Sequence, residues 1–227
     1  MIFLRFFLNI NNQILLKSFW LIKCRKQRCS FVYIAIMEIK YKNYQFSPDS
    51  GKLLVSEPFL ADPNFKKSVI LLCEHEAHGS VGFILNRLLE VDSDELLPGI
   101  LDANFPIYFG GPMEQNTLHF IHKVGPLVKD SLPIGNGIYW GGNLDTINDI
   151  VNSGLANTND FRFFIGYSGW DVGQLKAEIE QKSWWLTDMD LDIIFNEEIE
   201  EIWPESVKKL GSDFAYLADS PEDFNWN

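Results

Sequence analysis

The chain has 227 residues, of which 46% are hydrophobic, and its formal net charge at pH 7 is −12. A chain of this length and apolar content can bury a sizeable core, which excludes disorder along the whole chain. Its excess of carboxylates argues against direct binding of nucleic acid, because affinity for a phosphate backbone comes largely from clustered Lys and Arg side chains.

Residues 1–36 differ from the rest of the chain, since they hold six basic residues and no Asp or Glu. Without them, residues 37–227 contain 13 basic and 31 acidic residues, a net charge of −18. Polar residues interrupt every apolar stretch of residues 1–36, which argues against a membrane span and against a signal peptide. We predict that residues 1–36 are a non-native or disordered extension and that the domain begins at Met37.

Cysteine usage favours a cytoplasmic domain, because Cys73 is the single cysteine after residue 36 and cannot form an internal disulfide. Cys73 ends an apolar run, so we expect a buried small side chain rather than a nucleophile. His75 and His78 follow in a glutamate-rich stretch, but they lack the HExxH spacing and the helix that would present it. We therefore predict no dedicated metal site and no cofactor.

Short apolar runs bounded by turn signals recur along the domain and predict β-strands, because they are rich in Val, Ile, Phe and Tyr. In chain order, these predicted strands cover residues 68–73, 81–86, 106–109, 118–121, 137–140, 162–167 and 191–195.

Helical signals occur in three places. Apolar residues recur at helical spacing over residues 144–151, and Gly154 follows as a C-cap. A second helix is predicted over residues 173–182, and a third is predicted to begin at Pro204 and to end at Gly211. Because strands outnumber helices without strict alternation, the sequence favours a single α+β domain, followed by an acidic C-terminal tail.

A glycine-rich turn separates two of the predicted strands. Gly110 and Gly111 could bring bare amides close to an anion, but no phosphate-binding motif surrounds them and Pro112 removes a donor. We favour a structural bend over a phosphate loop. If a strand follows, His119 and Phe120 point to opposite faces, which places His119 beside the turn as a hydrogen-bonded structural residue or as a ligand.

Asn86 and Arg87 end another predicted strand. An arginine at a strand exit can bind a carboxylate or phosphate through two hydrogen bonds. In so acidic a domain, an ion pair with a neighbour such as Glu90 is the alternative that we favour.

The stretch "FFIGYSGWDVGQL" predicts a strand that turns sharply into a helix at Gln174, with Trp170 packed against the turn. A nucleophile elbow at Ser168 would need glycine where Trp170 stands, so a serine hydrolase is not supported.

Together these motifs resemble the AlgH/YqgE family over residues 47–225. Leu88 and Met113 depart from the family pattern, which commonly has proline and valine at these positions. The resemblance rests on the ordered set "GKLLVSEPFLADPNF", "SVILLCEH", "GSVGFILNR", "FGGPM", Leu118 with His119, "IGYSGWDVGQLKAEI" with Trp184 after it, and "DFNWN".

The resemblance implies a single α+β domain whose strongly bent mixed β-sheet forms a pseudo-barrel flanked by a few helices. The resemblance implies no catalytic residue and no cofactor for this chain. Members are often labelled as transcriptional regulators because of a role in controlling polysaccharide production, and such a role does not require contact with DNA.

Motif order leads us to expect one candidate pocket, and its residues are Asn86, Arg87, Gly110, Gly111, Pro112, His119, Tyr167, Gly169, Trp170 and Gln174. We predict a cytoplasmic regulatory protein that acts through a protein partner or a small ligand and is not an enzyme. Two alternatives stay open: an enzyme that uses Arg87 and His119 on a small phosphorylated or carboxylated metabolite, and a regulator that binds DNA directly. The sequence leaves the oligomeric state open.

Overall fold

The computed structural model describes residues 47–90, 93, 104–212 and 214–220, together with the backbone of two short paired strands, β1 (Asn9–Ile10) and β2 (Gln13–Ile14). Contacts between Cα atoms divide the chain into two units, Met1–Gln45 and Phe46–Asn227. Apart from these two strands, the expected extension over residues 1–36 lies outside the described residues, as does the acidic tail from residue 221.

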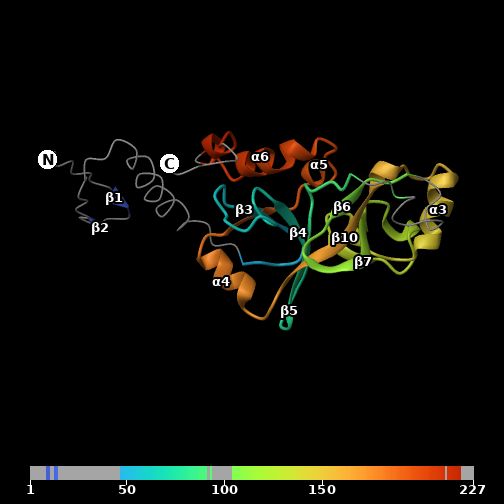
Figure 1. Ribbon diagram of the computed structural model, residues 1–227, viewed down its shortest axis with the longest axis horizontal. Coiled ribbons are helices and arrows are strands. Elements are labelled where there is room, and N and C mark those ends of the chain that lie inside the picture. The colour runs from blue at the N-terminus through green and yellow to red at the C-terminus, as the bar shows by residue number, and fades with distance from the viewer. Residues whose placement is uncertain are drawn as a thin grey trace. The chain divides into compact units, whose positions relative to one another are not determined.

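The second unit is built on a nine-stranded mixed sheet (Figure 1). Its short ninth strand, β6 (Ile107–Phe109), lies parallel to β10, whereas the other strand pairs of this sheet are antiparallel. The remaining strands follow the order β11 (Trp184–Asp188), β3 (Lys52–Ser56), β4 (Val69–Glu76), β5 (Gly79–Ile84), β10 (Phe161–Trp170), β7 (Met113–His122), β9 (Ile138–Trp140) and β8 (Leu132–Gly135).

The sheet is open, with β11 and β8 as its ends, but it curves back on itself. A Cβ placed on Gly51, just before β3, would lie 3.2 Å from the carbonyl oxygen of Ile134 in β8. The two ends of the strand order therefore come close together, as in a barrel that does not close. The expected α+β class with a bent mixed sheet is confirmed.

Most of the strands predicted from apolar runs are present, but the prediction for residues 191–195 is wrong. This segment forms α5 (Leu191–Ile194), because the Asp190 carboxylate caps it by accepting a hydrogen bond from the amide of Asp192 at 2.9 Å. The helical turn buries Ile193 and Ile194 side by side. The sequence analysis also missed β3, β8 and β11 as strands, although β3 is almost wholly buried.

Three predicted helices are confirmed as α3 (Leu144–Asn152), α4 (Gln174–Glu180) and α6 (Ile199–Lys209). The predicted start of the third helix at Pro204 is wrong, because α6 begins at Ile199 and Pro204 lies inside it. The earlier start buries Trp203, whose indole donates to the carbonyl of Ser56 at 3.0 Å. Short 3-10 helices occur at η1 (Gly125–Leu127), η2 (Thr158–Asp160) and η3 (Ala215–Leu217).

The helices cover different parts of the sheet (Figure 1). α4 and α6 lie on opposite faces of the β11, β3 and β4 region, whereas α3 packs near β6, β7 and β10. The core beside α4 contains Leu54, Ile70, Leu72, Ile84, Trp170, Leu175, Trp184 and Leu186. The core beside α3 contains Phe105, Ile107, Phe120, Val128, Ile147, Ile150, Ala156, Phe161 and Phe163.

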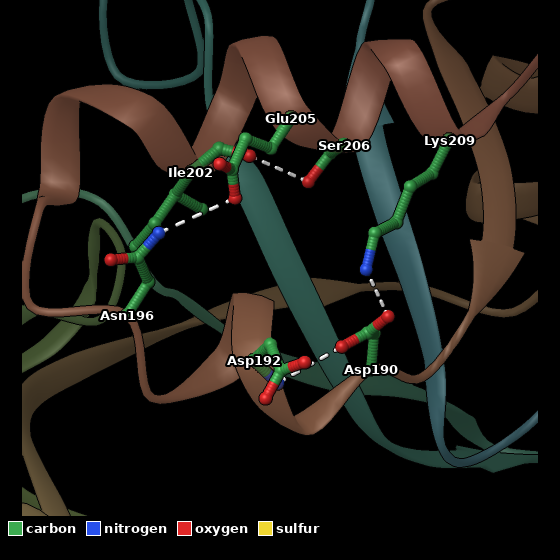
Figure 2. A network of polar contacts seen from close by, with 7 residues as sticks. All are labelled: Asp190, Asp192, Asn196, Ile202, Glu205, Ser206 and Lys209. Atoms are coloured by element: carbon green, nitrogen blue, oxygen red, sulfur yellow. Dashed lines mark hydrogen bonds and ion pairs between the residues drawn. The ribbon is translucent and has the colours of Figure 1, made fainter.

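Polar contacts fix the corner between α5 and α6, as Figure 2 shows. Lys209 at the end of α6 bonds the carboxylate of Asp190, and this hydrogen bond lowers the pKa of Asp190. The side-chain amide of Asn196 donates to Glu205 at 3.4 Å. The start of α5 is thereby bonded to the end of α6, and the segment between the two helices is bonded to the middle of α6.

A buried arginine joins this corner to the sheet. Arg162 of β10 is 3% exposed, and its guanidinium donates to the carbonyls of Leu85 at 3.0 Å and Asn196 at 2.6 Å. The guanidinium carbon also lies 4.3 Å from the centre of the Tyr108 ring. A charge can stay buried here because backbone carbonyls and an aromatic face replace water.

The substitution Arg162→Met should lower the free energy of unfolding by about 2–4 kcal/mol, because two buried carbonyls lose their donors while the side-chain volume is nearly kept. Urea unfolding followed by circular dichroism measures the change. Lys208→Met on the exposed side of α6 is the matched control. A loss below about 1 kcal/mol for Arg162→Met would show that the guanidinium bonds do not hold the corner.

Candidate functional site

The glycine turn carries the chain across β10. β6 and β7 pair with opposite edges of this strand, because Ile165 faces both Phe109 of β6 and Leu118 of β7. The connection from β6 to β7 through Gly110 and Gly111 therefore has to pass over the β10 backbone. The Gly110 amide donates to the carbonyl of Ile165 at 2.9 Å as the crossing begins.

Only glycine fits at this crossing. A Cβ on Gly110 would lie 2.2 Å from the carbonyl oxygen of Gly166, and a Cβ on Gly111 would lie 2.4 Å from the backbone of Tyr167. Gly166 itself has a φ of +68° and lies at a register shift in β10, where the strand bulges under the crossing. The predicted structural bend is confirmed, and its cause is close contact between two backbones.

Ser168 also belongs to the crossing. Its side chain is fully buried, and its hydroxyl donates to the carbonyl oxygen of Gly110 at 3.1 Å. This hydroxyl stabilises the turn, which agrees with the rejection of a nucleophile elbow at this position.

Four rings gather beside the crossing and form what we call the aromatic face: Phe83, His119, Trp140 and Tyr167. The His119 ring lies 5.2 Å from Phe83, 6.3 Å from Trp140 and 5.8 Å from Tyr167, measured between ring centres. Phe83 is fully buried, whereas the other three rings are partly exposed. The face is thus a buried aromatic base with a solvent-accessible rim.

Hydrogen bonds fix the proton on the His119 ring. The Thr117 hydroxyl donates to the carbonyl of Glu114 at 2.8 Å and lies 3.0 Å from Nε2 of His119. Because the hydroxyl has one proton, both bonds form only if Nε2 carries a proton and donates to Thr117. This assignment leaves a lone pair on Nδ1 of His119.

Burial lowers the pKa of His119, and the Glu114 carboxylate opposes this shift only in part. The ring is therefore neutral at pH 7, with Nδ1 available as a hydrogen-bond acceptor. Glu114 is exposed and has a φ of +42°, which is unusual for a residue with a side chain. It is the second residue of β7, the strand that carries His119.

An exposed apolar side chain extends the aromatic face. Met113 is 46% exposed, and its Cγ lies 3.5 Å from a Cβ placed on Gly169. The Tyr167 ring lies 3.1 Å from the same point, so Gly169 leaves room for both side chains. Met113 and Tyr167 are also paired across β7 and β10.

The other candidate residues bond elsewhere. Asn86 accepts from the amide of Val69 at 3.0 Å and donates to the carbonyl of Lys67 at 2.8 Å. Arg87 donates to the carbonyl of Lys66. These bonds tie the exit of β5 to the start of β4.

Trp170 and Gln174 form hydrogen bonds that anchor α4. The indoles of Trp170 and Trp184 both donate to Oε2 of Glu178 at 2.8 Å, and the side-chain amide of Gln174 donates to Oε1 at 2.9 Å. A single carboxylate thus connects the ends of two strands to one helix. Its role in the structure is to anchor α4 on the sheet.

The structure therefore brings together part of the expected set. Gly110, Gly111, His119, Tyr167 and Gly169 lie at the crossing and the aromatic face, with Pro112 in the connection between them.

The sequence analysis did not assign Phe83, Met113, Glu114, Thr117 and Trp140 to the site. Phe83 and Trp140 lie in predicted strands, but only the pairing of those strands brings them beside His119.

Neither cysteine nor metal chemistry is favoured elsewhere in the described part of the domain. Cys73 is buried, and burial raises the pKa of its thiol well above the usual value. His75 bonds Ser80 at 2.7 Å and His78 bonds Glu74 at 3.1 Å. No group of three potential metal ligands occurs among the described residues. Within the same residues, every helix is too short or too polar to cross a membrane.

Comparisons with known proteins agree with the architecture. The sequence model of the family described as AlgH-like matches residues 53–215. A UPF0301 protein of Chlorobium limicola is 42% identical over 172 residues, which cover 76% of this chain and 92% of that protein. A UPF0301 protein of Cytophaga hutchinsonii is 35% identical over 174 residues, which cover 76% of this chain and 96% of that protein.

Two solved structures resemble the chain. The crystal structure of protein DIP2367 from Corynebacterium diphtheriae gives a TM-score of 0.70 at 19% identity and covers 80% of this chain and 97% of that one, which shows a shared fold. The solution structure of the AlgH protein from Pseudomonas aeruginosa gives a TM-score of 0.61 at 26% identity, covering 78% of this chain and 97% of that one.

The substitution Gly110→Ala should destabilise the domain by about 3 kcal/mol, because its Cβ would overlap a backbone oxygen that cannot move without disturbing β10. Gly137→Ala is the control: Gly137 has a φ of +80° in a hairpin turn, yet no atom lies within 4 Å of an added Cβ. The control should lose about 1–2 kcal/mol through backbone conformation alone. Equal losses in urea unfolding would contradict an essential backbone contact at the crossing.

His122 should make the stability of the domain depend on pH. It is fully buried, and among the described residues neither ring nitrogen has a partner within the usual limits of hydrogen-bond geometry. Burial lowers its pKa from 6.5 to about 4, and the Gly141 backbone opposes this only in part. The unfolded state therefore binds the proton first, so the contribution of the neutral ring is complete above about pH 6.5 and is lost as the pH falls towards 4.

The substitution His122→Phe should abolish this part of the pH dependence, which is on the order of 2 kcal/mol between pH 7 and pH 4.5. Chemical unfolding at both pH values gives the difference between variant and wild type. The same slope in wild type and His122→Phe would assign the acid sensitivity to other groups.

Proposed function

The chain belongs to the AlgH-like family, and we propose that it acts in the cytoplasm as a regulatory protein by binding a protein partner at the aromatic face. The observation that carries this proposal is the partly exposed rim of His119, Trp140 and Tyr167 beside the exposed side chain of Met113. Exposed aromatic and methionine side chains are typical of binding surfaces, since they offer large contact areas at low conformational cost.

The rigidity of this surface supports binding. The aromatic face lies against the backbone crossing at Gly110 and Gly111, and its base is the stacked pair of Phe83 and Phe164, whose ring centres are 4.8 Å apart. Side chains held by strands and by a packed base lose little freedom when a partner binds. A preorganised surface suits recognition.

Catalysis is less well supported than binding. The hydroxyl of Ser168 is buried and bonded to Gly110, and burial keeps the Cys73 thiol protonated. The side chains of Arg87 and His119, the pair required by the enzyme alternative, each have a structural hydrogen-bond partner, the Lys66 carbonyl and the Thr117 hydroxyl. A small ligand at the aromatic face stays the alternative to a protein partner.

Charge argues against direct contact with DNA. Residues 37–227 have a net charge of −18, and exposed acidic side chains are frequent around α5 and α6. Such a domain repels a phosphate backbone, so a regulatory effect on transcription would act through another protein.

Affinity capture with the full chain as bait should recover a partner that depends on the aromatic face. Tyr167→Ala should reduce recovery at least about fivefold, because truncating an aromatic anchor at an interface commonly costs more than 1 kcal/mol. Tyr216→Ala is the control, since Tyr216 is 52% exposed and lies in η3. Quantitative mass spectrometry of the captured proteins gives the ratios.

Fluorescence anisotropy of labelled genomic duplex fragments should show no binding at physiological salt. Sequence-dependent binding under these conditions would overturn the proposal in favour of direct DNA recognition.

In the capture experiment, equal recovery by wild type and Tyr167→Ala would show that the partner binds another surface.

A further inference from the structure

The geometry of the aromatic face points to the chemistry of its partner, and we propose that it binds the ammonium group of a lysine side chain in a basic segment of the partner protein. This inference rests on the proposed function. It follows from what the face offers: one hydrogen-bond acceptor, partly exposed aromatic rings and a nearby carboxylate.

The acceptor is Nδ1 of His119. The Thr117 hydroxyl oxygen accepts a hydrogen bond from Nε2–H of His119, because its own proton is donated to the Glu114 carbonyl. The His119 side chain is partly exposed, and the bond between Nε2 and Thr117 leaves Nδ1 as the acceptor atom of the ring. A ligand that meets this atom has to supply an N–H or O–H donor.

The rings favour a cation as the donor. Tyr167 stands edge-on to His119 with an angle of 82° between the ring planes, and the Trp140 ring is tilted by 43° to the same histidine with the ring centres 6.3 Å apart. Trp and Tyr present negative ring faces, which attract ammonium groups within about 6 Å. Because burial keeps His119 neutral, the imidazole does not repel such a cation.

A carboxylate adds to the attraction. Glu114 is exposed and close enough to His119 to raise the pKa of that ring against the effect of burial. Its φ of +42° is held by the Thr117 hydroxyl, which bonds its carbonyl at 2.8 Å. The net charge of −18 over residues 37–227 attracts basic partners over a longer range.

Lysine fits this set better than arginine does. A guanidinium presents a planar fork of donors that suits the two oxygens of a carboxylate, whereas an ammonium is a compact charge that suits a single acceptor and a ring face. The exposed Met113 beside Tyr167 offers apolar contact for the methylene stem of the lysine. This extension of the surface also favours a protein segment over a free small amine.

The test uses the full chain and an acetylated, amidated nine-residue peptide with one central lysine among Gly and Ser. Two peptides of the same sequence carry Nε-acetyl-lysine or glutamate instead, and butylamine represents a free small amine. Chemical-shift changes of aromatic resonances report binding, including weak binding. The lysine peptide should shift the resonances of the aromatic face, and the acetyl-lysine and glutamate peptides should bind at least about fivefold more weakly.

Two variants separate the contributions of the His119 acceptor and of the Glu114 carboxylate to peptide binding. His119→Phe keeps a ring but removes the acceptor, so affinity should fall about tenfold. Glu114→Gln should weaken binding about two- to fivefold and reduce its dependence on salt. His78→Gln, an exposed histidine at the hairpin of β4 and β5, is the matched control and should bind as wild type does. Unfolding midpoints equal to that of wild type confirm that each variant is folded.

Lowering the pH should also weaken binding, because protonation of His119 removes the lone pair and adds a positive charge. The pKa of His119 lies below its usual value, so this loss occurs on the acidic side of pH 6.5.

The outcomes distinguish this inference from the proposed function. Partner capture that depends on Tyr167, together with equal binding of the lysine and acetyl-lysine peptides, would overturn the lysine assignment and leave the proposed function in place. Butylamine binding as tightly as the peptide would assign the site to a small amine. No peptide binding and no dependence of capture on Tyr167 would overturn both proposals.

Discussion

The contact between two backbones at Gly110 and Gly166 is the constraint on which the rest of the domain depends. A Cβ at Gly110 would come within 2.2 Å of the Gly166 carbonyl oxygen, so the chain can cross β10 only through glycine. Because it crosses there, β6 and β7 occupy opposite edges of β10, and β5 can pair with the distal half of the same strand. The sheet thereby receives its curvature and its strand order.

The same crossing sets the chemistry of the aromatic face. It places Met113 opposite Tyr167 and leads β7 back along β10, so that His119 lies beside Tyr167 and over Phe83. Strand alternation then separates the two histidines of β7. His119 reaches the accessible rim, whereas His122 is buried and stacks on Tyr139 with ring centres 5.5 Å apart.

Polar side chains join the surrounding helices to β10, the strand that the chain crosses. Arg162 of β10 reaches the carbonyl of Asn196 between α5 and α6, and Glu178 of α4 accepts from Trp170 at the other end of the strand. Both contacts join helices to β10 through charge-assisted hydrogen bonds, one from a buried guanidinium and one to a partly buried carboxylate. A surface supported from several sides in this way suits recognition of a partner in an otherwise acidic domain.

The sequence by itself determined the family and much of the local structure. Short runs rich in β-forming residues predicted β4, β5, β6, β7, β9 and β10. The sequence also predicted that His119 and Phe120 point to opposite faces of their strand, and the glycine pair indicated a bend. Tertiary structure alone decided which segments meet. Residues 191–195 have the composition of a strand, but the cap at Asp190 and the burial of Ile194 make the segment helical. Trp140 joins His119, and Trp170 instead bonds Glu178, because strand pairing and helix packing connect residues far apart in the chain, which local periodicity does not encode.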